Sequence, residues 1–428
     1  MAGTARRSLL GRYGIWIGFA VLLIVLPFIF RSSLALSMLS QMGYLVIICL
    51  SYNILLGQGG MLSFGHAVYT GLGSFLAVHA MNWATKGAIP LPVVVIPLVG
   101  GLAGLFFAAL FGYVTTKKSG TTFAMITLGI GELVAAMSLM FPGFFGGEGG
   151  VTTNRTYGGG FLGLKFGSQL QVYYLIVVYC FISTVLMYAF TLTPLGRMLN
   201  AVRDNPERVE FVGYSTQRVR YLGFIIAGFF AGIGGGLAAI NFEIVNAADS
   251  LNAIRSGGYL LFTFLGGATF FFGPMIGAVL LVFASILLSE LSKAWLLYLG
   301  LAFLLMVMYA PGGVASLIMM NVRVAAFGKF KRLVTPYIGL ILATAVMVVG
   351  AAMLIEMIYH MQLNAALGPK VRLFGAELDT SQSGAWTVAA GLLLVGLAAF
   401  EVVRRKFVVV WGHAQEEIEA EIKRRDSL

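Results

Sequence analysis

Ser63 and His66 are the two side chains whose types and spacing first suggest chemistry. A serine hydroxyl beside an imidazole can act as a nucleophile and its base, and residues three apart share one face of a helix over 61–83. No acidic residue that could orient the histidine lies nearby, and the surrounding run is apolar. We therefore expect this pair to line a polar pathway or to hydrogen-bond neighbouring helices, and we expect no catalytic residue in the chain.

Glycines are dense around this pair. Gly57, Gly59, Gly60, Gly65, Gly71 and Gly73 all fall within seventeen residues of one another. Glycine allows helices to pack closely, but it also permits an unwound segment whose free backbone groups contact a ligand. Both interpretations are open at this stage. The second predicts a pathway lined by Gly59, Gly60, Ser63, Phe64, Gly65 and His66.

Glu132 is a carboxylate near the middle of a strongly apolar run, TLGIGELVAAM. A charge at the centre of a membrane helix costs at least ~2.5 kcal/mol on insertion scales, so the group should be paired, protonated or in contact with water. Glu132 is therefore predicted either to line the pathway or to hydrogen-bond a neighbouring helix. Glu243, Asp249 and Glu356 lie near the predicted ends of apolar runs, where water would solvate them.

The segment 192–217 carries helix-capping signals. Thr193-Pro194 and Asn205-Pro206 each place a capping side chain before a proline, which favours the first position of a helix. We expect two short helices here. The second should end at Gly213, because glycine readily adopts the left-handed conformation that stops a helix.

Between these helices lies a charged stretch with apolar residues behind it. The charged and capping residues are Arg203, Asp204, Asn205, Pro206, Glu207 and Arg208, and the apolar ones are Val209, Phe211 and Val212. A short amphipathic helix fitted into a groove is a common mode of protein recognition. The segment is predicted to dock another protein, although a plain connecting loop is the alternative.

The elements that position these residues follow from composition. Hydrophobic residues make up 59% of the 428 and charged residues 11%, where a soluble domain has roughly 25% charged residues. The surface therefore faces a lipid bilayer. The net charge of +11 comes from short basic clusters between apolar runs, which indicates membrane orientation rather than nucleic-acid binding. Cys49 and Cys180 offer no disulfide framework or metal site.

Runs of about 20 apolar residues predict an all-α, polytopic membrane protein with about ten core spans and two further C-terminal spans. The expected spans are 14–30, 37–56, 61–83, 91–114, 120–141, 170–191, 218–242, 257–272, 275–289, 294–310, 335–358 and 384–403. The glycine and proline near 273 allow either a turn between two spans or one re-entrant segment.

The distribution of basic residues predicts the orientation. With both termini in the cytoplasm, most of the 28 lysines and arginines fall in cytoplasmic segments. The first run is expected to be an uncleaved helix, although Arg6, Arg7 and Arg12 before it resemble a signal peptide. The outer segment 142–169, rich in glycine and threonine, is either an ordered gate or docking loop or a flexible connection.

The C-terminal third is predicted to have three parts. Residues 321–334 are basic and amphipathic, as expected of a linker helix at the membrane surface. Two additional spans follow within 335–403, and 404–428 form a charged cytoplasmic tail.

Three stretches carry a family resemblance, namely YNILLGQGGMLSFGHAVYTGLGSFLA (52–77), GRMLNAVRDNPERVEFVGYSTQRVRYLGFIIAGFFAGIGGGLAA (196–239) and FLGGATFFFGPMIGAVLL (264–281). In order and spacing they resemble permeases for branched-chain amino acids in ABC transporters, particularly the LivM type. The resemblance covers about 14–320 and implies a permease core over 1–320. It also implies that 194–213 form the coupling helices that contact the ATPase. In the broader permease pattern Glu207 is followed by two alanines, where this chain has Arg208 and Val209.

The resemblance also implies partners. These are a second homologous permease of the LivH type, two ABC ATPase subunits, a periplasmic or extracellular solute-binding protein and the lipid bilayer of the bacterial inner membrane. The chain contains no Walker A motif, G-x-x-x-x-G-K-[ST]. ATP and Mg are therefore expected on the partner subunits, and no cofactor is expected in this chain.

Several alternatives remain for the function. The substrate is expected to be a branched-chain or other hydrophobic amino acid, with urea, short amides or aromatic acids as the alternatives within related importers. A secondary carrier or channel that acts alone is the alternative from another class, and a membrane scaffold is a third. Ion-coupled carriers have several ionisable groups inside the membrane, whereas this core offers only Glu132 and His66.

Overall fold

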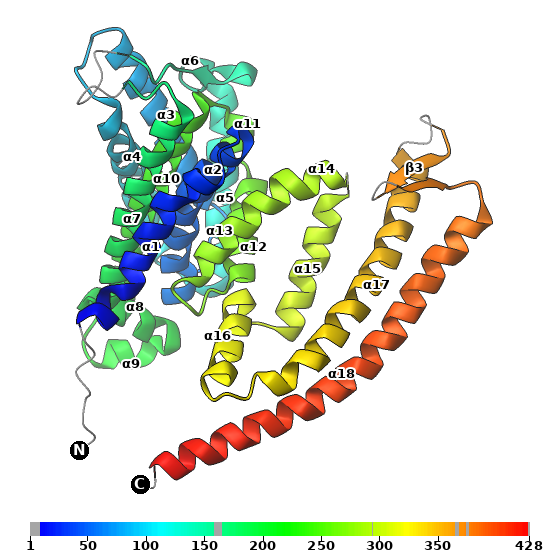
Figure 1. The fold of residues 1–428 in the computed structure, drawn as a ribbon. Helices are drawn as coiled ribbons and strands as arrows, with labels where there is room; N and C mark the ends of the chain where they lie inside the picture. Colours follow the sequence, from blue (N-terminus) through cyan, green and yellow to red (C-terminus); the bar gives the residue numbers. More distant parts are fainter. Residues whose placement is uncertain (1–8, 158–164, 293, 364–367, 374–375, 427–428) are drawn as a thin grey trace. The chain divides into compact units, whose positions relative to one another are not determined.

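The computed structural model describes residues 9–157, 165–292, 294–363, 368–373 and 376–426, most of them in α-helices (Figure 1). Arg6 and Arg7, which precede the first apolar run, lie outside the described residues, as do Lys293 and residues 158–164 of the glycine-rich segment. The chain forms two compact units. The first comprises Met1–Phe283 with Met306–Ala315, and the second comprises Ala284–Leu305 with Ser316–Leu428.

The first unit is a helical bundle with two short strands. Its elements are α1 (Leu9–Ile29), α2 (Ser33–Asn53) with a π-helical turn (Ile54–Gln58), α3 (His66–Thr85), α4 (Ile96–Thr115), α5 (Gly120–Met140), α6 (Pro142–Phe145), β1 (Val151–Thr152), α7 (Gln169–Leu192), α8 (Pro194–Asp204), α9 (Pro206–Phe211), α10 (Thr216–Phe242), β2 (Ile244–Val245), α11 (Ala247–Ser250), α12 (Ala253–Gly266) and α13 (Gly273–Phe283).

The prediction of a polytopic helical membrane protein is confirmed. Within the described part, eight helices are long and apolar enough to cross a bilayer by themselves, and a bent pair, Trp295–Tyr309 with Gly313–Ala326, could provide a ninth. The expected count of twelve spans stays a prediction. α12 has 14 residues, which at 1.5 Å per residue is too short to cross the hydrocarbon alone.

Close packing of α4 against α10 forms the centre of the first unit. A Cβ atom added to Gly104 would clash with the carbonyl oxygen of Gly228, and one added to Gly100 would lie 2.6 Å from that of Gly232. Small residues on both helices allow the two backbones to touch, as is common between membrane helices. Many of the bundle's glycines therefore serve packing.

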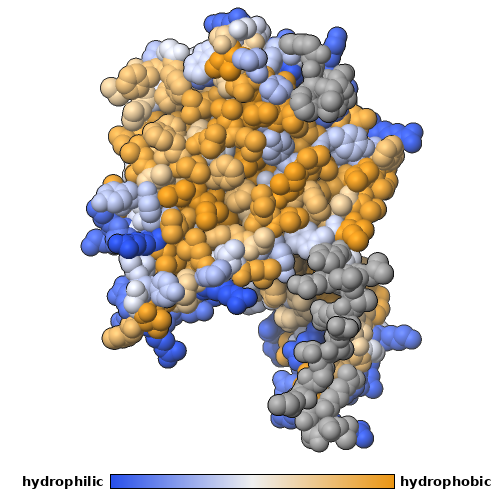
Figure 2. Space-filling model, turned by 90° about the vertical axis from the view of Figure 1, so that its left-hand side faces the viewer, coloured by the Kyte–Doolittle hydropathy of each residue, from blue (hydrophilic) through white to orange (hydrophobic). Residues whose placement is uncertain are grey.

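The outward face of α4 shows the opposite composition. Leu102, Phe106 and Leu110 are more than half exposed, although they lie on the same helix as the packed glycines. Figure 2 shows a broad apolar belt on the first unit with hydrophilic residues gathered at its margins. Exposed leucine and phenylalanine at this density match a lipid environment.

The segment after α5 is ordered where it is described. α6, a 3₁₀ turn (Gly147–Gly149) and β1 follow one another, and Val151 and Thr152 of β1 pair antiparallel with Val245 and Ile244 of β2. Arg155 donates to the carbonyl oxygens of Phe166, Ile240 and Asn241. The described part is thus an ordered cap on the end of α10, and its role as a gate or docking loop stays a prediction.

α12 and α13 form a helical hairpin. α12 ends at Gly266, α13 begins at Gly273, and a Cβ atom on Gly277 would clash with the carbonyl oxygen of Phe262 in the facing helix. A turn joins the two helices, and both interpretations of this region, two spans or one re-entrant segment, stay predictions. The expected span 257–272 ends six residues early, because Gly267 has φ +115° and stops the helix.

The second unit contains helices and a β-hairpin. Its elements are a π-helical turn (Ala284–Leu288), α14 (Ser289–Leu291), most of α15 (Trp295–Tyr309) and of α16 (Gly313–Ala326), α17 (Lys331–Leu363), β3 (Lys370–Leu373), β4 (Ala376–Asp379) and α18 (Ser383–Asp426). α17 and α18 pack along each other, with Gly350 of α17 against the backbone of Leu392 and Leu393. α16 joins them through a small core of Val324, Leu333 and Ile418.

The predicted tail belongs to a helix, since α18 continues to Asp426. Two expectations for this unit are wrong. The single linker helix over 321–334 is interrupted, because Gly328 takes φ +70° between α16 and α17. Glu356 is not solvated but buried, and it accepts hydrogen bonds from Ser292 Oγ and, at 3.2 Å, from Tyr298 Oη. The roles assigned to the C-terminal parts stay predictions.

Candidate functional site

The chain is unwound between α2 and α3. After the π-helical turn that ends at Gln58, residues 59–65 are not helical, and Gly60 has φ +62°. Tyr52 of α2 replaces the missing helical partners of Ser63, because its hydroxyl donates to Ser63 O at 2.8 Å and accepts from Ser63 N at 3.2 Å. The prediction of an unwound segment is confirmed.

The expected helix over 61–83 is wrong at its start. α3 begins at His66, so Ser63 and His66 do not share a helix face. The physical reason is the run of hydrogen bonds from side chains to the backbone of 59–65, which an uninterrupted helix would not need. His66 instead contacts α2, with Nε2 at 2.9 Å from Ser51 Oγ.

Three buried polar atoms around the break lack partners among the described residues. They are Asn53 Oδ1, Ser63 Oγ and His66 Nδ1, in side chains exposed by no more than 2%. A buried polar atom without a hydrogen bond lowers the stability of the fold by about 1–3 kcal/mol. Water or a polar ligand that bonded these three atoms would therefore stabilise the unwound segment. No cluster of three metal-ligating side chains occurs in the searched part of the chain.

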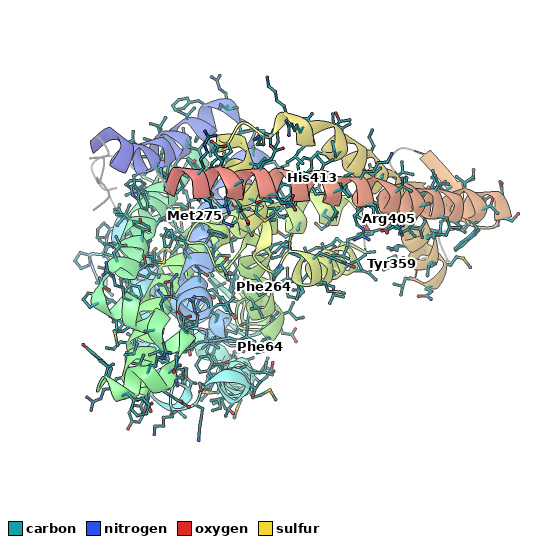
Figure 3. All side chains as sticks on the ribbon, turned by 90° about the horizontal axis from the view of Figure 1, so that it is seen from below. Phe64, Phe264, Met275, Tyr359, Arg405 and His413 are labelled. Carbon is teal, nitrogen blue, oxygen red and sulfur yellow. The ribbon has the colours of Figure 1, made fainter. Side chains whose placement is uncertain are left out.

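α5 and α12 form the other walls of the break. Phe64 N donates to Thr127 Oγ1 of α5 at 3.1 Å, and Ala67 N donates to Ser256 Oγ of α12 at 2.9 Å. A side chain at Gly65 would clash with the backbone of Thr127. Seen from below, Phe64 and Phe264 of α12 lie on the same side of the first unit (Figure 3). Most of the predicted pathway residues are therefore together at one place.

Glu132 lies on the exposed face of α5, one residue after Gly131, where an added Cβ atom would lie 3.7 Å from the Cα of Gly65. It makes no hydrogen bond or ion pair with any residue the structure describes. A hydrogen bond to a neighbouring helix of this chain is therefore not found. The carboxylate is therefore on an exposed face of α5, and its role in a pathway stays a prediction.

The two short helices after α7 form as predicted. Thr193 Oγ1 accepts from Gly196 N at the start of α8, and Asn205 Oδ1 accepts from Arg208 N at the start of α9. Gly213 takes φ +92° after α9. Ser215 Oγ then caps α10 by accepting from Arg218 N.

α9 presents an apolar tip. Phe211 is 89% exposed and Val212 is 73% exposed, whereas Val209 on the other side of the helix is buried. Glu207 and Arg208 are exposed on the same short helix, and Arg203 pairs with Asp204 at 2.9 Å. An exposed phenylalanine on a rigidly capped helix is typical of an interaction site.

α8 is bonded to the break itself. Arg203 donates through Nη1 to the carbonyl oxygen of Gly57, and Asn200 Nδ2 donates to Gln58 Oε1 at 2.8 Å. A side chain at Gly60 would lie 2.7 Å from Arg203 Cγ. Asn200 was not predicted as a site residue, and Arg203 was assigned only to the docking surface. The short helices and the unwound segment are thus joined directly.

A cavity of about 50 Å³ lies beyond the break, toward the end of the bundle that carries α6 and α11. Tyr44, Arg255 and Tyr259 are among its lining residues, together with the hydroxyls of Thr70, Ser74 and Ser250. None of these residues was predicted. They come from four segments that are far apart in the sequence. The sequence signal that could have indicated a site here is the arginine at the start of a short apolar helix.

Comparison with known proteins identifies the family of this chain. Residues 34–311 match the family model described as branched-chain amino acid transport system / permease component. The high-affinity branched-chain amino acid transport system permease proteins LivM of Escherichia coli (strain K12) and Salmonella typhimurium are each 26% identical, over 63% of this chain and 67% of theirs.

The galactose/methyl galactoside import permease protein MglC of Haemophilus influenzae is 25% identical, over 62% of this chain and 79% of its own length. No solved structure matches the chain. The family match covers α2 through α15, which includes the unwound segment, the short helices α8 and α9, and the cavity. The chain is a multi-pass membrane protein and belongs to the family of permease components of branched-chain amino acid transport systems.

Proposed function

We propose that this chain is the permease subunit of an ATP-driven importer for branched-chain or other hydrophobic amino acids. It would form half of the translocation pathway beside a second, homologous permease of the LivH type. Two ABC ATPase subunits would bind ATP and Mg, and a solute-binding protein would deliver the substrate. Family membership supports the transporter class, and the exposed tip of α9 supports a partner on one face.

The observation that carries the proposal is the surface formed by residues 203–213. Phe211 and Val212 are almost fully exposed on a helix that is capped at both ends, so the apolar tip is held ready for contact. Glu207 and Arg208 add charges beside it. An ATPase subunit would receive this tip in a surface groove, as amphipathic helices are commonly bound.

The bonds between α8 and the break provide a route for coupling. A movement of α9 with its ATPase would pull on α8, and the contacts of Arg203 with Gly57 and Asn200 with Gln58 would pass that movement to residues 59–65. Ser63 lies within this segment and His66 directly follows it, and both carry buried polar atoms without partners among the described residues. The pathway would therefore open and close at the unwound segment.

The proposed pathway residues are Gly59, Gly60, Ser63, Phe64, Gly65, His66 and Glu132. Glu132 faces outward from α5 next to Gly65, so its carboxylate would lie where two permease subunits meet. A charge there is stabilised by water in a pathway and would be costly against lipid.

The orientation is also proposed. α8 and α9 would be cytoplasmic, since the ATPases act in the cytoplasm, and both termini would lie on the same side. The substrate class is supported by the family and by the two LivM relatives, and the galactoside permease shows that related chains serve sugars.

Replacing Glu207 by arginine tests the docking surface. The reversed charge on the exposed face of α9 should weaken co-purification of the ATPase subunits from membranes by about tenfold or more, because a charge facing a like charge at an interface costs several kcal/mol. Phe211→Ser removes the apolar tip. The binding free energy between this chain and the ATPase should then fall by about 2 kcal/mol or more, as at other interface hot spots, and co-purification should weaken accordingly.

Lys118→Glu is the matched control. Lys118 is exposed in the turn between α4 and α5, and its substitution also reverses one charge. This variant should retain the ATPases at the level of the unaltered chain. Undiminished recovery of the ATPases with both Glu207→Arg and Phe211→Ser would contradict the assignment of α9.

A further inference from the structure

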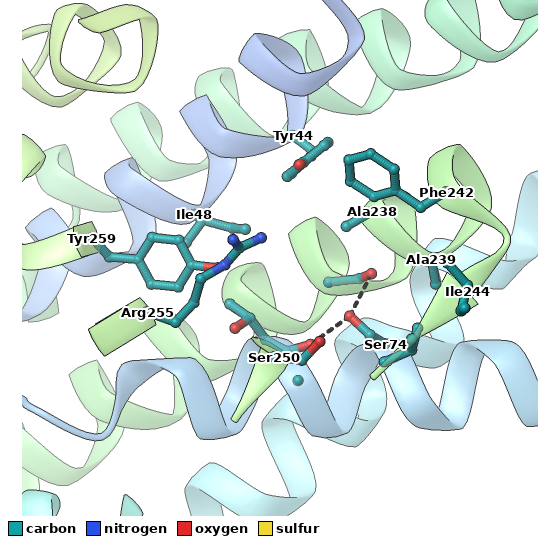
Figure 4. Close-up of a pocket in the computed structure, with 14 residues that line it drawn as sticks. Tyr44, Ile48, Ser74, Ala238, Ala239, Phe242, Ile244, Ser250, Arg255 and Tyr259 are labelled. Carbon is teal, nitrogen blue, oxygen red and sulfur yellow. Dashed lines mark hydrogen bonds between the residues drawn. The ribbon is translucent and has the colours of Figure 1, made fainter. Parts of the chain in front are cut away.

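The cavity beyond the break has an unusual chemical lining. Its walls come from α2, α3, the end of α10 and the segment 244–259, and its volume is about 50 Å³. This volume suffices for several water molecules or for one small charged group. Figure 4 shows the guanidinium of Arg255 beside the ring of Tyr259, with Tyr44 and Phe242 across from it. Arg255 is the cationic residue in this lining.

The guanidinium of Arg255 has hydrogen-bond donors that are not used within the described chain. Its Nε donates to Tyr259 Oη at 3.3 Å, but its two terminal nitrogens make no hydrogen bond to any residue the structure describes. Asp249 is close enough to act on its charge, yet the two form no ion pair within 4.0 Å. A planar guanidinium with two parallel donors free matches the geometry of a carboxylate.

Tyr44 adds a second unpartnered polar group. Its side chain is 2% exposed, and its hydroxyl makes no hydrogen bond to any described residue. The hydroxyl is not among the fully enclosed polar atoms without a partner, so its oxygen reaches the open space of the cavity. Tyr44 lines the same cavity as Arg255, so one ligand oxygen could satisfy both residues.

The position of α12 strengthens the site. Arg255 lies in the first turn of α12, where Asn252 Oδ1 accepts from Arg255 N at 2.7 Å. α12 is a 14-residue helix whose first turn is largely open, with Ile254 80% exposed and Arg255 exposed, while the buried Ser256 of the same turn accepts a hydrogen bond from Ala67 N of α3. The N-terminal end of a half-length membrane helix carries a partial positive charge that attracts anionic groups of a substrate.

The opposite wall offers oxygen atoms. Ser74 Oγ lies 2.8 Å from Gly235 O and 2.9 Å from Thr70 O, so its hydroxyl donates to backbone and keeps lone pairs for a further donor. The cavity thus has a cationic side at Arg255 and an acceptor side at Ser74. A zwitterion whose carboxylate and ammonium are attached to one carbon atom, as in an α-amino acid, matches this polarity.

We propose that Arg255, together with the hydroxyl of Tyr44 and the start of α12, binds the α-carboxylate of an amino acid on its way to the unwound segment. This inference rests on the proposed function and assigns it a substrate contact. The cavity holds only the polar head of the amino acid. The apolar side chain extends past Phe242 and Ile48, which also line the cavity.

The test uses the complete transporter, reconstituted in liposomes with its partner permease, its ATPases and its solute-binding protein. Arg255→Gln should lower ATP-driven uptake of radiolabelled leucine about ten- to a hundredfold, because hydrogen bonds to a charged group are lost. Arg255→Lys keeps the charge without the planar fork and should give an intermediate rate. Arg31→Gln, which removes an exposed arginine outside the cavity, should leave uptake unchanged.

Two further readouts separate the possible sources of the carboxylate. Binding of the solute-binding protein to the liposomes, and the ATPase activity that it stimulates, should be the same for Arg255→Gln and the unaltered complex. Wild-type uptake by Arg255→Gln would overturn the proposal. A parallel loss of uptake and of solute-binding-protein attachment would also overturn it, since Arg255 would then contact an acidic residue of that protein.

Failure of the proposed function looks different. In that case the unaltered complex would show no ATP-dependent uptake at all, whatever residue occupies position 255.

Circular dichroism and gel filtration of each purified variant would confirm that the substitution leaves the fold intact.

Discussion

The glycines of the bundle have two different structural roles, and the atoms around each glycine show which role it has. Gly100, Gly104, Gly228 and Gly232 allow α4 and α10 to touch, and an added Cβ on any of them would meet the backbone of the facing helix. Gly60 instead takes a left-handed conformation within the break. The sequence alone could not distinguish packing glycines from glycines in an unwound segment, because both kinds occur as frequent glycines within apolar runs.

Gly104→Ala should destabilise the protein. The new methyl group would clash with the carbonyl oxygen of Gly228, and overpacking of this kind costs about 1–3 kcal/mol. Gly129→Ala is the control, because nothing lies within 4 Å of a Cβ at that position of α5, and alanine favours a helix by about 0.5–1 kcal/mol. The measurement is the temperature at which each purified variant loses its monodisperse gel-filtration peak. Equal midpoints for the two variants would contradict the packing argument.

Residue-level prediction succeeded where the signal was local. Thr193, Asn205 and Gly213 were all identified as caps or stops, because a cap needs only its own next three residues. Arg255 and Tyr44 were missed because they are more than two hundred residues apart in the sequence. Nothing local indicates that a tyrosine of α2 and an arginine of α12 share one cavity.

At the level of elements, α8 connects the docking surface with the pathway. Its polar residues Asn200 and Arg203 reach Gln58 and Gly57, and its apolar residue Leu199 is fully buried next to Gly59 and Gly223. The helix positions were predictable from proline and capping residues. The contacts were not, since they depend on how α2 ends in a π-helical turn.

Arg203→Ala should uncouple ATP hydrolysis from uptake. Without the bond to Gly57, α8 could move with the ATPase while residues 59–65 stay in place, so uptake per ATP hydrolysed should fall several-fold while ATPase subunits still co-purify. Arg197→Ala is the control, because Arg197 is an exposed arginine on the same helix and its side chain makes no hydrogen bond to any residue that the structure describes. The ratio of leucine uptake to phosphate release in liposomes measures the effect. An unchanged ratio for Arg203→Ala would show that coupling takes another route.

At the level of the whole molecule, composition was sufficient for the fold class but not for its internal divisions. The helical membrane architecture and most helix positions of the first unit were predicted from apolar runs of the right length. Three shorter features were not: the late start of α3, the early end of α12 and the turn at Gly328. Each depends on backbone conformations or tertiary hydrogen bonds that hydropathy does not record.

Within the second unit, α17 and α18 lie beyond the residues that match the family and were predicted as additional spans, but a buried carboxylate of this unit was misjudged. Glu356 was expected in water, and it is instead held by Ser292 and Tyr298 within that unit. The position of Glu356 near the end of an apolar run gave no sign of these hydroxyls, one of which comes from residue 292.

The central claim is that this permease moves its substrate only when a separate ATPase acts on α9. The most direct test is leucine uptake by liposomes that contain this chain and its partner permease, with and without the ATPase subunits and ATP. Uptake should require both ATPases and nucleotide, and Glu207→Arg should abolish it without loss of inserted protein. Leucine uptake that proceeds at the same rate without ATPases or nucleotide would contradict the account and identify a carrier or channel that works alone.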